Sequence, residues 1–135
     1  MKKYSVLLVD DEEDVVKAIM QKIDWDGLGY SLLGYAKNGL EALEIAEEKQ
    51  VDVVLTDIKM PYMDGLTLSH KLKELYPSIK IVIFSGFDEF EYAKEAIRLE
   101  AEEYVLKPVD SGELSRIFRT VHERLDKEFD EKQNI

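Results

Sequence analysis

Residues 51–57 read Val-Asp-Val-Val-Leu-Thr-Asp, and this stretch decides the fold. It is β-branched and apolar through most of its length, which is typical of a strand inside a sheet. Continuous apolar strands of this kind occur in parallel sheets whose two faces are both covered by helices. The stretch therefore predicts an α/β fold, and it places the carboxylate of Asp57 at the end of a buried strand.

Three other strand-like segments of the chain also end in polar residues. These residues are Asp10 and Asp11 after SVLLV, Ser85 after IKIVIF, and Lys107 after EEYVL. In an open parallel sheet, ligands bind in the crevice outside the carboxyl ends of the strands. Together with Asp57, these residues bring three carboxylates, one hydroxyl and one ammonium to a single predicted pocket.

Amphipathic stretches separate the strands and predict the helices that cover the sheet. The first contains Val15, Val16 and Ile19 and stops at residues 26–29, after which Tyr30–Ala36 is expected to form a weaker strand. The other helices are expected over 39–49, after Asp64, after the capping-box pair Asp88 and Glu91, and after Asp110. This alternation predicts one doubly wound (βα)5 domain over residues 1–125. Residues 126–135 are expected to be a C-terminal helix extension or a linker to an absent output domain.

The composition excludes several functions. The chain has 135 residues, enough for one domain, and a formal net charge of -11. Direct contact with nucleic acid is not expected from so acidic a domain, because phosphate-backbone binders carry clustered Lys and Arg. The absence of cysteine excludes disulfides, thiolate nucleophiles and Cys-type zinc sites. No apolar run approaches the roughly 18 residues of a membrane span, so we expect a cytoplasmic protein that does not bind membranes.

Two histidines, His70 and His122, lie on separate predicted helices and have no partner at metal-ligand spacing. They are expected at the surface or in a groove, and no histidine is a candidate phosphodonor.

Four ordered motifs, VLLVDDEEDV, VDVVLTDIKMPYMDGL, IVIFSGFDEF and EEYVLKPVD, resemble those of response-regulator receiver domains of two-component signalling. The resemblance covers about residues 4–125 and implies a flavodoxin-like fold with a parallel five-stranded sheet in the order 2-1-3-4-5. The stretch from Trp25 to Glu44 and that from Ser85 to Pro108 are similar to receivers of AraC-type transcriptional regulators. The implied role is a phosphorylation switch in transcription regulation, not an enzyme with turnover.

The resemblance implies that Asp57 is the phosphoacceptor and that the reaction depends on Mg²⁺ or Mn²⁺. Carboxylates capture phosphoryl groups covalently in other proteins, and hard divalent cations prefer oxygen ligands. In the family pattern Asp11 ligates the metal directly and Asp10 mainly through water, while Asp57 and the backbone carbonyl of Lys59 supply further ligands. Three crowded carboxylates repel one another, so a bound cation would relieve the pocket.

The same resemblance gives roles to three residues from the later strands. Lys107 pairs with Asp57 at rest and with a phosphoryl oxygen afterwards, and the Lys107–Pro108 bond is expected to be cis. Ser85 donates its hydroxyl to the phosphoryl group. Tyr104 is expected to move inward as the switch residue, with a plain strand aromatic as the alternative.

Two departures from the family pattern carry expectations of their own. Glu100 stands where family members usually place Gly, at a position that often needs a left-handed backbone. A glutamate there is expected to cost about 1 kcal/mol or to force a different helix cap. Lys59 and Phe87 flank the expected path of the hydrolytic water, which predicts a long phosphoryl lifetime.

The expected partners are a sensor histidine kinase and a second copy of the chain. The copy would dock through helix 88–99, strand 103–107 and helix 111–125. Two alternatives remain: a pseudo-receiver that acts as an unphosphorylated binding scaffold, and a haloacid-dehalogenase-type phosphatase. The phosphatase mechanism needs a second Asp two residues after the nucleophile, where this chain has Lys59.

Overall fold

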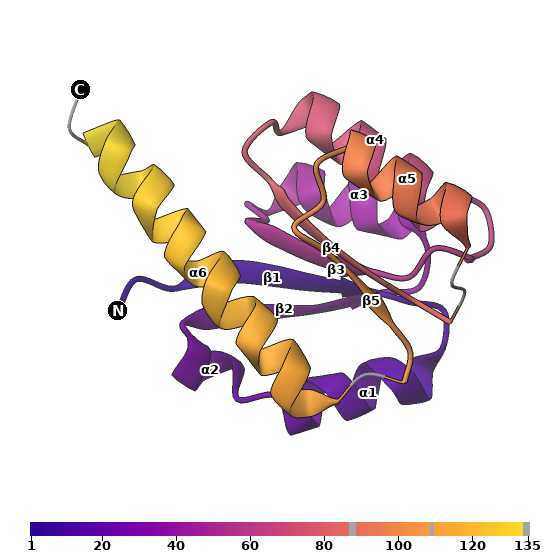
Figure 1. Cartoon of the computed structure of the whole chain (residues 1–135), viewed down its shortest axis with the longest axis horizontal. Helices are drawn as coiled ribbons and strands as arrows, with labels where there is room; N and C mark the ends of the chain where they lie inside the picture. Colours follow the sequence, from indigo (N-terminus) through magenta and orange to yellow (C-terminus); the bar gives the residue numbers. More distant parts are fainter. Residues whose placement is uncertain (87–88, 109, 134–135) are drawn as a thin grey trace.

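A parallel five-stranded sheet forms the centre of the computed structural model, which describes residues 1–86, 89–108 and 110–133 (Figure 1). Within these ranges the strands lie in the order β2-β1-β3-β4-β5, and every neighbouring pair is parallel. The strands are β1 (Tyr4–Val9), β2 (Tyr30–Ala36), β3 (Val53–Thr56), β4 (Lys80–Ser85) and β5 (Glu103–Leu106). The expected fold class and strand order are confirmed.

Helices cover both faces of the sheet, as Figure 1 shows. Their bounds are α1 (Glu13–Lys22), α2 (Trp25–Leu28), α3 (Gly39–Glu48), α4 (Gly65–Leu75), α5 (Phe90–Arg98) and α6 (Ser111–Gln133). The helices α1, α2 and α6 pack on one face, and α3, α4 and α5 pack on the other. The segment expected to break the first helix forms the short helix α2, which Asp24 caps by accepting a hydrogen bond from the Gly27 backbone at 3.1 Å.

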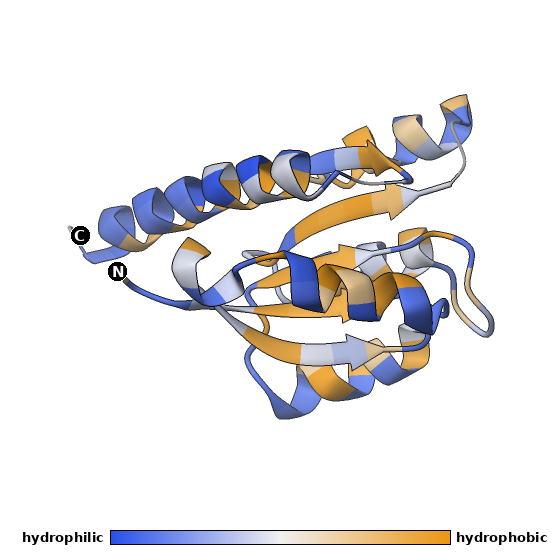
Figure 2. Cartoon of the chain, turned by 90° about the horizontal axis from the view of Figure 1, so that it is seen from below, coloured by the Kyte–Doolittle hydropathy of each residue, from blue (hydrophilic) through white to orange (hydrophobic). Residues whose placement is uncertain are grey.

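Strand β1 shows why the apolar run produces a two-faced sheet. Val6 and Leu8 point into the core under α1 and α6, whereas Leu7 and Val9 point into the core under α3 and α4. Burial of each such side chain contributes about 1.5–3 kcal/mol relative to exposure. In Figure 2 the strands are predominantly hydrophobic, and the outer sides of the helices are predominantly hydrophilic. The double burial of the strands therefore fixes the layered arrangement.

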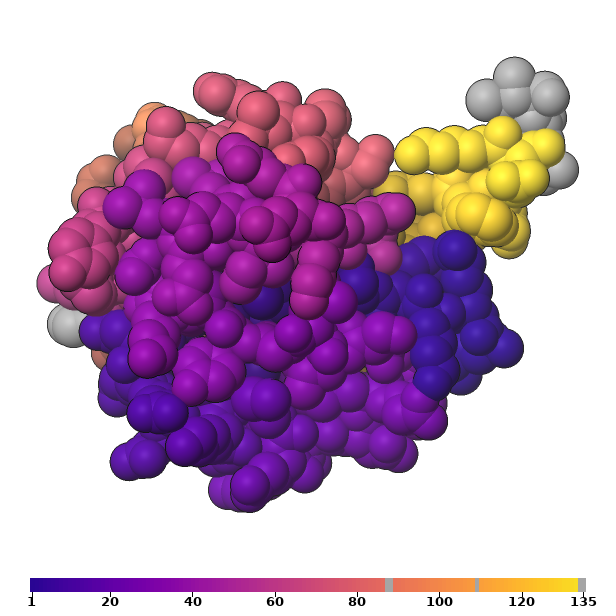
Figure 3. All heavy atoms as spheres, turned by 180° about the vertical axis from the view of Figure 1, so that it is seen from behind, coloured from indigo at the N-terminus to yellow at the C-terminus, as the bar shows by residue number. Residues whose placement is uncertain are grey.

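The last helix, α6, continues without interruption to Gln133, past the boundary expected at residue 125. Its buried residues are Leu114, Ile117, Phe118, Val121, His122 and Leu125. Its C-terminal part projects beyond the body of the domain (Figures 1 and 3). Within residues 1–86, 89–108 and 110–133, no helix is both long and apolar enough to cross a membrane.

Two further expectations concern helix ends. Asp64 caps α4 as expected, because its Oδ1 accepts a hydrogen bond from the Thr67 backbone at 2.8 Å. The capping residue expected for α5, Asp88, lies outside the described residues. The expectation for His122 is wrong: it is only 7% exposed, since it packs between Tyr4 and Tyr30.

Glu100 adopts the expected left-handed conformation, with φ of 60°. The Glu100 backbone donates to Ile97 at 3.0 Å and the Ala101 backbone donates to Ala96 at 2.9 Å. These two hydrogen bonds form the Schellman motif, whose left-handed position is usually glycine.

Candidate functional site

Three carboxylates meet at the carboxyl edge of the sheet. Asp10 and Asp11 follow β1, and Asp57 follows the neighbouring strand β3. Val9 and Thr56 are register partners, so the two strands end side by side. One carboxylate oxygen from each of the three aspartates lies within 4.8 Å of the others. The structure therefore brings together the acids that the strand pattern predicts.

Asp57 is held tightly at the bottom of this pocket and is 5% exposed. Its Oδ1 accepts a hydrogen bond from the Ile58 backbone at 2.8 Å. The following loop folds back beneath it, where the Gly65 backbone donates to the Ile58 carbonyl at 2.7 Å. A Cβ at Gly65 would collide with the backbone carbonyl oxygen of Asp57, so the close approach requires glycine.

Lys107 reaches the same pocket from the end of β5. Its ammonium donates hydrogen bonds to Asp10 Oδ2 at 2.8 Å, Asp57 Oδ2 at 3.1 Å and Glu12 Oε1 at 3.3 Å. The Lys107–Pro108 peptide bond is cis, as expected. Burial works against the charged ammonium, but the hydrogen bonds and charges of Asp10 and Asp57 outweigh burial and raise the pKa of Lys107.

The electrostatics of the pocket favour the binding of a cation. Burial raises the pKa of Asp10, which is 1% exposed, and the neighbouring charge of Asp57 raises it further. The hydrogen bonds from Lys107 and from the Glu12 backbone oppose these effects only in part. Burial also raises the pKa of Asp11. Three oxygen ligands at this spacing fit a hard divalent cation such as Mg²⁺, which typically takes one or two carboxylates plus water and phosphate oxygens.

The other predicted site residues lie around the same edge. Ser85 is the last residue of β4 and is fully buried, and its carbonyl accepts a hydrogen bond from the Lys107 backbone at 2.8 Å. Tyr104 is half-buried on β5, where it pairs with Ile83 in register. Lys59 is exposed on the loop after β3, with its Nζ 6.0 Å from the centre of the Tyr92 ring.

The pocket contains one residue that the sequence did not predict, Glu12. The strand-end pattern assigns Glu12 no role in the pocket, yet its side chain contacts the Lys107 ammonium. Its position directly after two aspartates was the one available signal. Phe87 lies outside the described residues.

The strand order and the acidic pocket at the carboxyl edge place the chain in the flavodoxin-like class of α/β proteins. The family model described as "Response regulator receiver domain" matches residues 6–119. The chain belongs to this family, and it is a receiver domain of the two-component response regulators.

Its relatives include transcriptional regulators. It is 45% identical over 111 residues to "Uncharacterized transcriptional regulatory protein YesN" of Bacillus subtilis, covering 82% of this chain and 30% of that protein. It is 34% identical over 125 residues to "Transcriptional regulatory protein HptR" of Staphylococcus aureus, covering 90% of this chain and 49% of that protein. The chain thus spans less than half the length of these curated relatives.

Solved structures agree with this assignment. The receiver domain of AraT, a response regulator from Geobacillus stearothermophilus, superimposes with a TM-score of 0.87 at 41% identity, covering 93% of this chain and 97% of that one. A two-component transcriptional regulator AraC from Clostridium phytofermentans superimposes with a TM-score of 0.80 at 34% identity, covering 87% and 91%. The similarity to AraC-type regulators therefore extends from sequence to structure.

Proposed function

We propose that Asp57 accepts a phosphoryl group from the phosphohistidine of a sensor histidine kinase, in a reaction that depends on Mg²⁺ or Mn²⁺. The observation that carries this proposal is the surroundings of the Asp57 carboxylate. Oδ2 lies 3.1 Å from the Lys107 ammonium, and the carboxylates of Asp10 and Asp11 lie within 4.8 Å. A carboxylate between an ammonium and a cation site is suited to receive an anionic group.

In the proposed step, a carboxylate oxygen of Asp57 attacks phosphorus in line with the leaving imidazole. The O–P bond forms, the P–N bond of the donor breaks, and the imidazole leaves with the electron pair and takes a proton from solvent. Such transfers depend mainly on positioning and electrostatic stabilisation. Lys107 neutralises charge on the phosphoryl oxygens, and the Ser85 hydroxyl donates a hydrogen bond to one of them. A cation held by Asp10, Asp11, Asp57 and the Lys59 carbonyl would supply further charge neutralisation.

The signal would leave the site as a shift between two arrangements of Ser85 and Tyr104. We place the responding surface on α5, β5 and α6 and infer that it pairs with a second copy of the chain. Its exposed apolar residues support this inference, because Phe90 is 76%, Ile97 is 78% and Leu106 is 44% exposed. Phe90 and Ile97 stand seven residues apart on α5, which puts them on one face of the helix, and exposed apolar faces often mark interaction surfaces.

We further propose that residues 1–125 are the receiver and that residues 126–135, of which 126–133 belong to α6, are a link to an output domain in the cytoplasm. The length of the relatives and the unbroken course of α6 support this division. The proposed output is transcription, without direct contact between this domain and nucleic acid. The protein would be a switch that modifies itself, without turnover of a substrate.

The test is to incubate the chain with Mg²⁺ and phosphoramidate and to measure its intact mass. We expect the wild-type chain to gain the mass of one phosphoryl group, and we expect Asp57→Asn and a chelator-treated sample to gain none. An unmodified wild-type chain under these conditions would favour the scaffold alternative. Phosphorylation of Asp57→Asn would instead place the acceptor elsewhere.

A further inference from the structure

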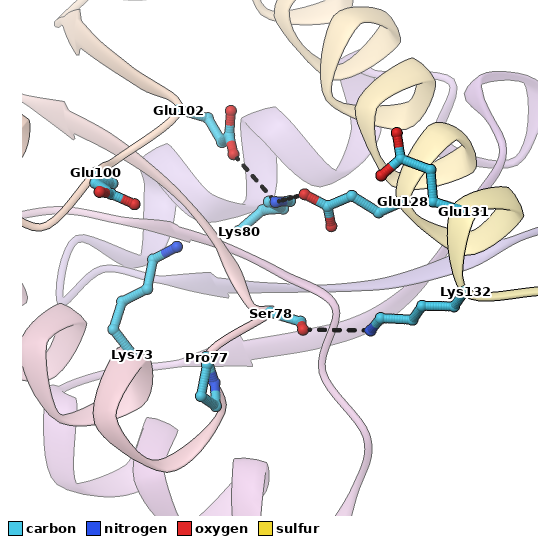
Figure 4. A pocket seen from close by; sticks show the side chains of 9 residues that line it. All are labelled: Lys73, Pro77, Ser78, Lys80, Glu100, Glu102, Glu128, Glu131 and Lys132. Atoms are coloured by element: carbon cyan, nitrogen blue, oxygen red, sulfur yellow. Dashed lines mark hydrogen bonds and ion pairs between the residues drawn. The ribbon is translucent and has the colours of Figure 1, made fainter. Parts of the chain in front are cut away.

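A second pocket, of about 600 Å³, lies at the opposite end of β4 from Ser85 (Figure 4). It is bounded by the last turn of α4, the first residue of β4, the loop before β5 and the far end of α6. Three lysines line it: Lys73, Lys80 and Lys132. None of them belongs to the proposed phosphoacceptor site.

Two of the three lysines have partners in the pocket. The ammonium of Lys80 lies 2.5 Å from Glu128 and 3.6 Å from Glu102, and it is largely buried. The Lys132 ammonium donates to the Ser78 hydroxyl at 3.4 Å. Figure 4 marks these interactions with dashed lines. Both ammonium groups therefore have polar partners, as buried cations usually do.

Lys73 differs from its neighbours. Its side chain is half-buried and extends into the pocket with its nitrogen toward Lys80 (Figure 4). Within the part of the chain that the structure describes, it forms no ion pair or hydrogen bond. Burial lowers the pKa of Lys73, and the positive charge of Lys80 lowers it further. Glu102, Glu100 and Glu128 oppose the shift without cancelling it.

Two features of this setting favour a nucleophilic amine at Lys73. Only the uncharged amine carries a free electron pair, and proteins activate lysines by desolvation or by a neighbouring cation. Lys73 has both, together with an open cavity on the side of its nitrogen. Its exposed neighbour on the same helix, Lys71, lacks this burial.

We propose that Lys73 is a site of covalent acylation by small activated acyl donors, namely acyl phosphates or acyl thioesters. The Lys73 amine attacks the carbonyl carbon of the donor, so that the N–C bond forms. The C–O or C–S bond breaks, and phosphate or thiolate leaves with the electron pair. The amine proton goes to water, and the product is an uncharged amide. Acylation would remove one of the three positive charges of the pocket and leave its glutamates with Lys80 and Lys132.

The experiment treats the purified chain with acetyl phosphate in one arm and acetyl-coenzyme A in another, at about pH 7. Digestion after glutamate keeps Lys71 and Lys73 on one peptide, and fragment masses give the acetylation of each. We expect Lys73 to react several-fold faster than Lys71. The advantage should shrink as the pH rises past about 10.4, the pKa of an unperturbed lysine, because protonation of the amine then no longer limits the reaction.

The two arms and two variants make the result decisive. An advantage in only one arm identifies the donor class and supports the proposal. Equal or slower acetylation of Lys73 at pH 7 in both arms would overturn it. Lys73→Arg should remove the fast site and leave Lys71 unchanged. In Asp57→Asn, Lys73 should be acetylated at the same rate as in the wild-type chain. A failure of this proposal is therefore distinguishable from a failure of phosphorylation.

Discussion

The Lys107 ammonium lies 3.1 Å from Asp57 Oδ2, although the strands that precede these two residues are separated by β4. The same ammonium donates to Asp10 at 2.8 Å, so a single cation joins the ends of β1, β3 and β5. Its side chain is only 15% exposed. Lys107 is thus both the resting counter-charge of the pocket and a link across the sheet edge.

Replacement of this lysine should therefore destabilise the fold. In Lys107→Gln the carboxylates of Asp10 and Asp57 lose their shared partner, and we expect a loss of about 3–5 kcal/mol at pH 7, the scale for a broken buried ion pair. Because the pKa of Lys107 is raised on folding, its contribution is present below about pH 10 and is lost as the pH rises through the folded pKa. Urea unfolding measures the difference.

Lys71→Gln serves as the matched control, because Lys71 is exposed and substitutions at such sites stay within about 0.5 kcal/mol. If Lys107→Gln were as stable as this control, the ammonium would not hold the pocket together.

The acidic pocket should itself limit stability when no divalent cation is present. Burial raises the pKa of Asp10 in the folded state, so the folded chain binds this proton more readily than the unfolded chain. The contribution of Asp10 to the free energy of unfolding therefore falls as the pH rises from about 4 through the folded pKa. We expect Asp10→Asn to have a higher urea midpoint than wild type at pH 7, and no advantage near pH 3.

Added Mg²⁺ should reverse this order. At about 100 times its Kd, a ligand stabilises the folded state by about 2.7 kcal/mol, and Asp10→Asn would have a weaker site. Asp14→Asn is the control: Asp14 is exposed in the first turn of α1, where a negative charge is favourable, so this variant should be slightly less stable. If Mg²⁺ left the urea midpoint of the wild-type chain unchanged, this result would contradict the proposed metal site.

The sequence predicts the sheet and most of the pocket for one physical reason. Buried strands have an apolar pattern that can be recognised locally, and parallel strands bring their carboxyl ends to one edge. The start of β3 is less well predicted. The predicted strand includes Val51 and Asp52, but the Asp52 carboxylate accepts a hydrogen bond from the Ser5 backbone at 2.8 Å, and the strand begins at Val53.

The features that were missed depend on partners distant in sequence. His122 is buried because its Nε2 donates to the Lys2 carbonyl at 2.8 Å and its Nδ1 lies 3.3 Å from Asp126. Glu12 belongs to the pocket because its carboxylate contacts the ammonium of Lys107, which is distant in the sequence. Helical periodicity carries no information about such contacts, so only the folded structure reveals them.

The left-handed residue Glu100 offers a stabilising substitution. Its φ of 60° is unfavourable for a residue with a Cβ, and the Schellman hydrogen bonds do not require the side chain. We expect Glu100→Gly to stabilise the chain by about 0.5–1 kcal/mol, since relief of the strain exceeds the entropy that glycine loses on folding. Glu100→Ala keeps the backbone strain while it removes the charge. Equal stabilisation by both variants would assign the gain to charge instead of backbone.

Gly65 tests how closely the loop after β3 must approach Asp57. A Cβ there would collide with the Asp57 backbone carbonyl, which cannot move without shifting the carboxylate. We expect Gly65→Ala to cost about 2–4 kcal/mol, in the range of severe steric strain, and to lower the yield of phosphorylation by phosphoramidate. The matched control is Gly86→Ala directly after β4, where an added Cβ would meet no atom of the described residues within 4 Å. Thermal unfolding measures the stability of the two variants, and intact mass measures their phosphorylation yield. Equal stability and equal yield would show that the close approach at Gly65 does not position Asp57.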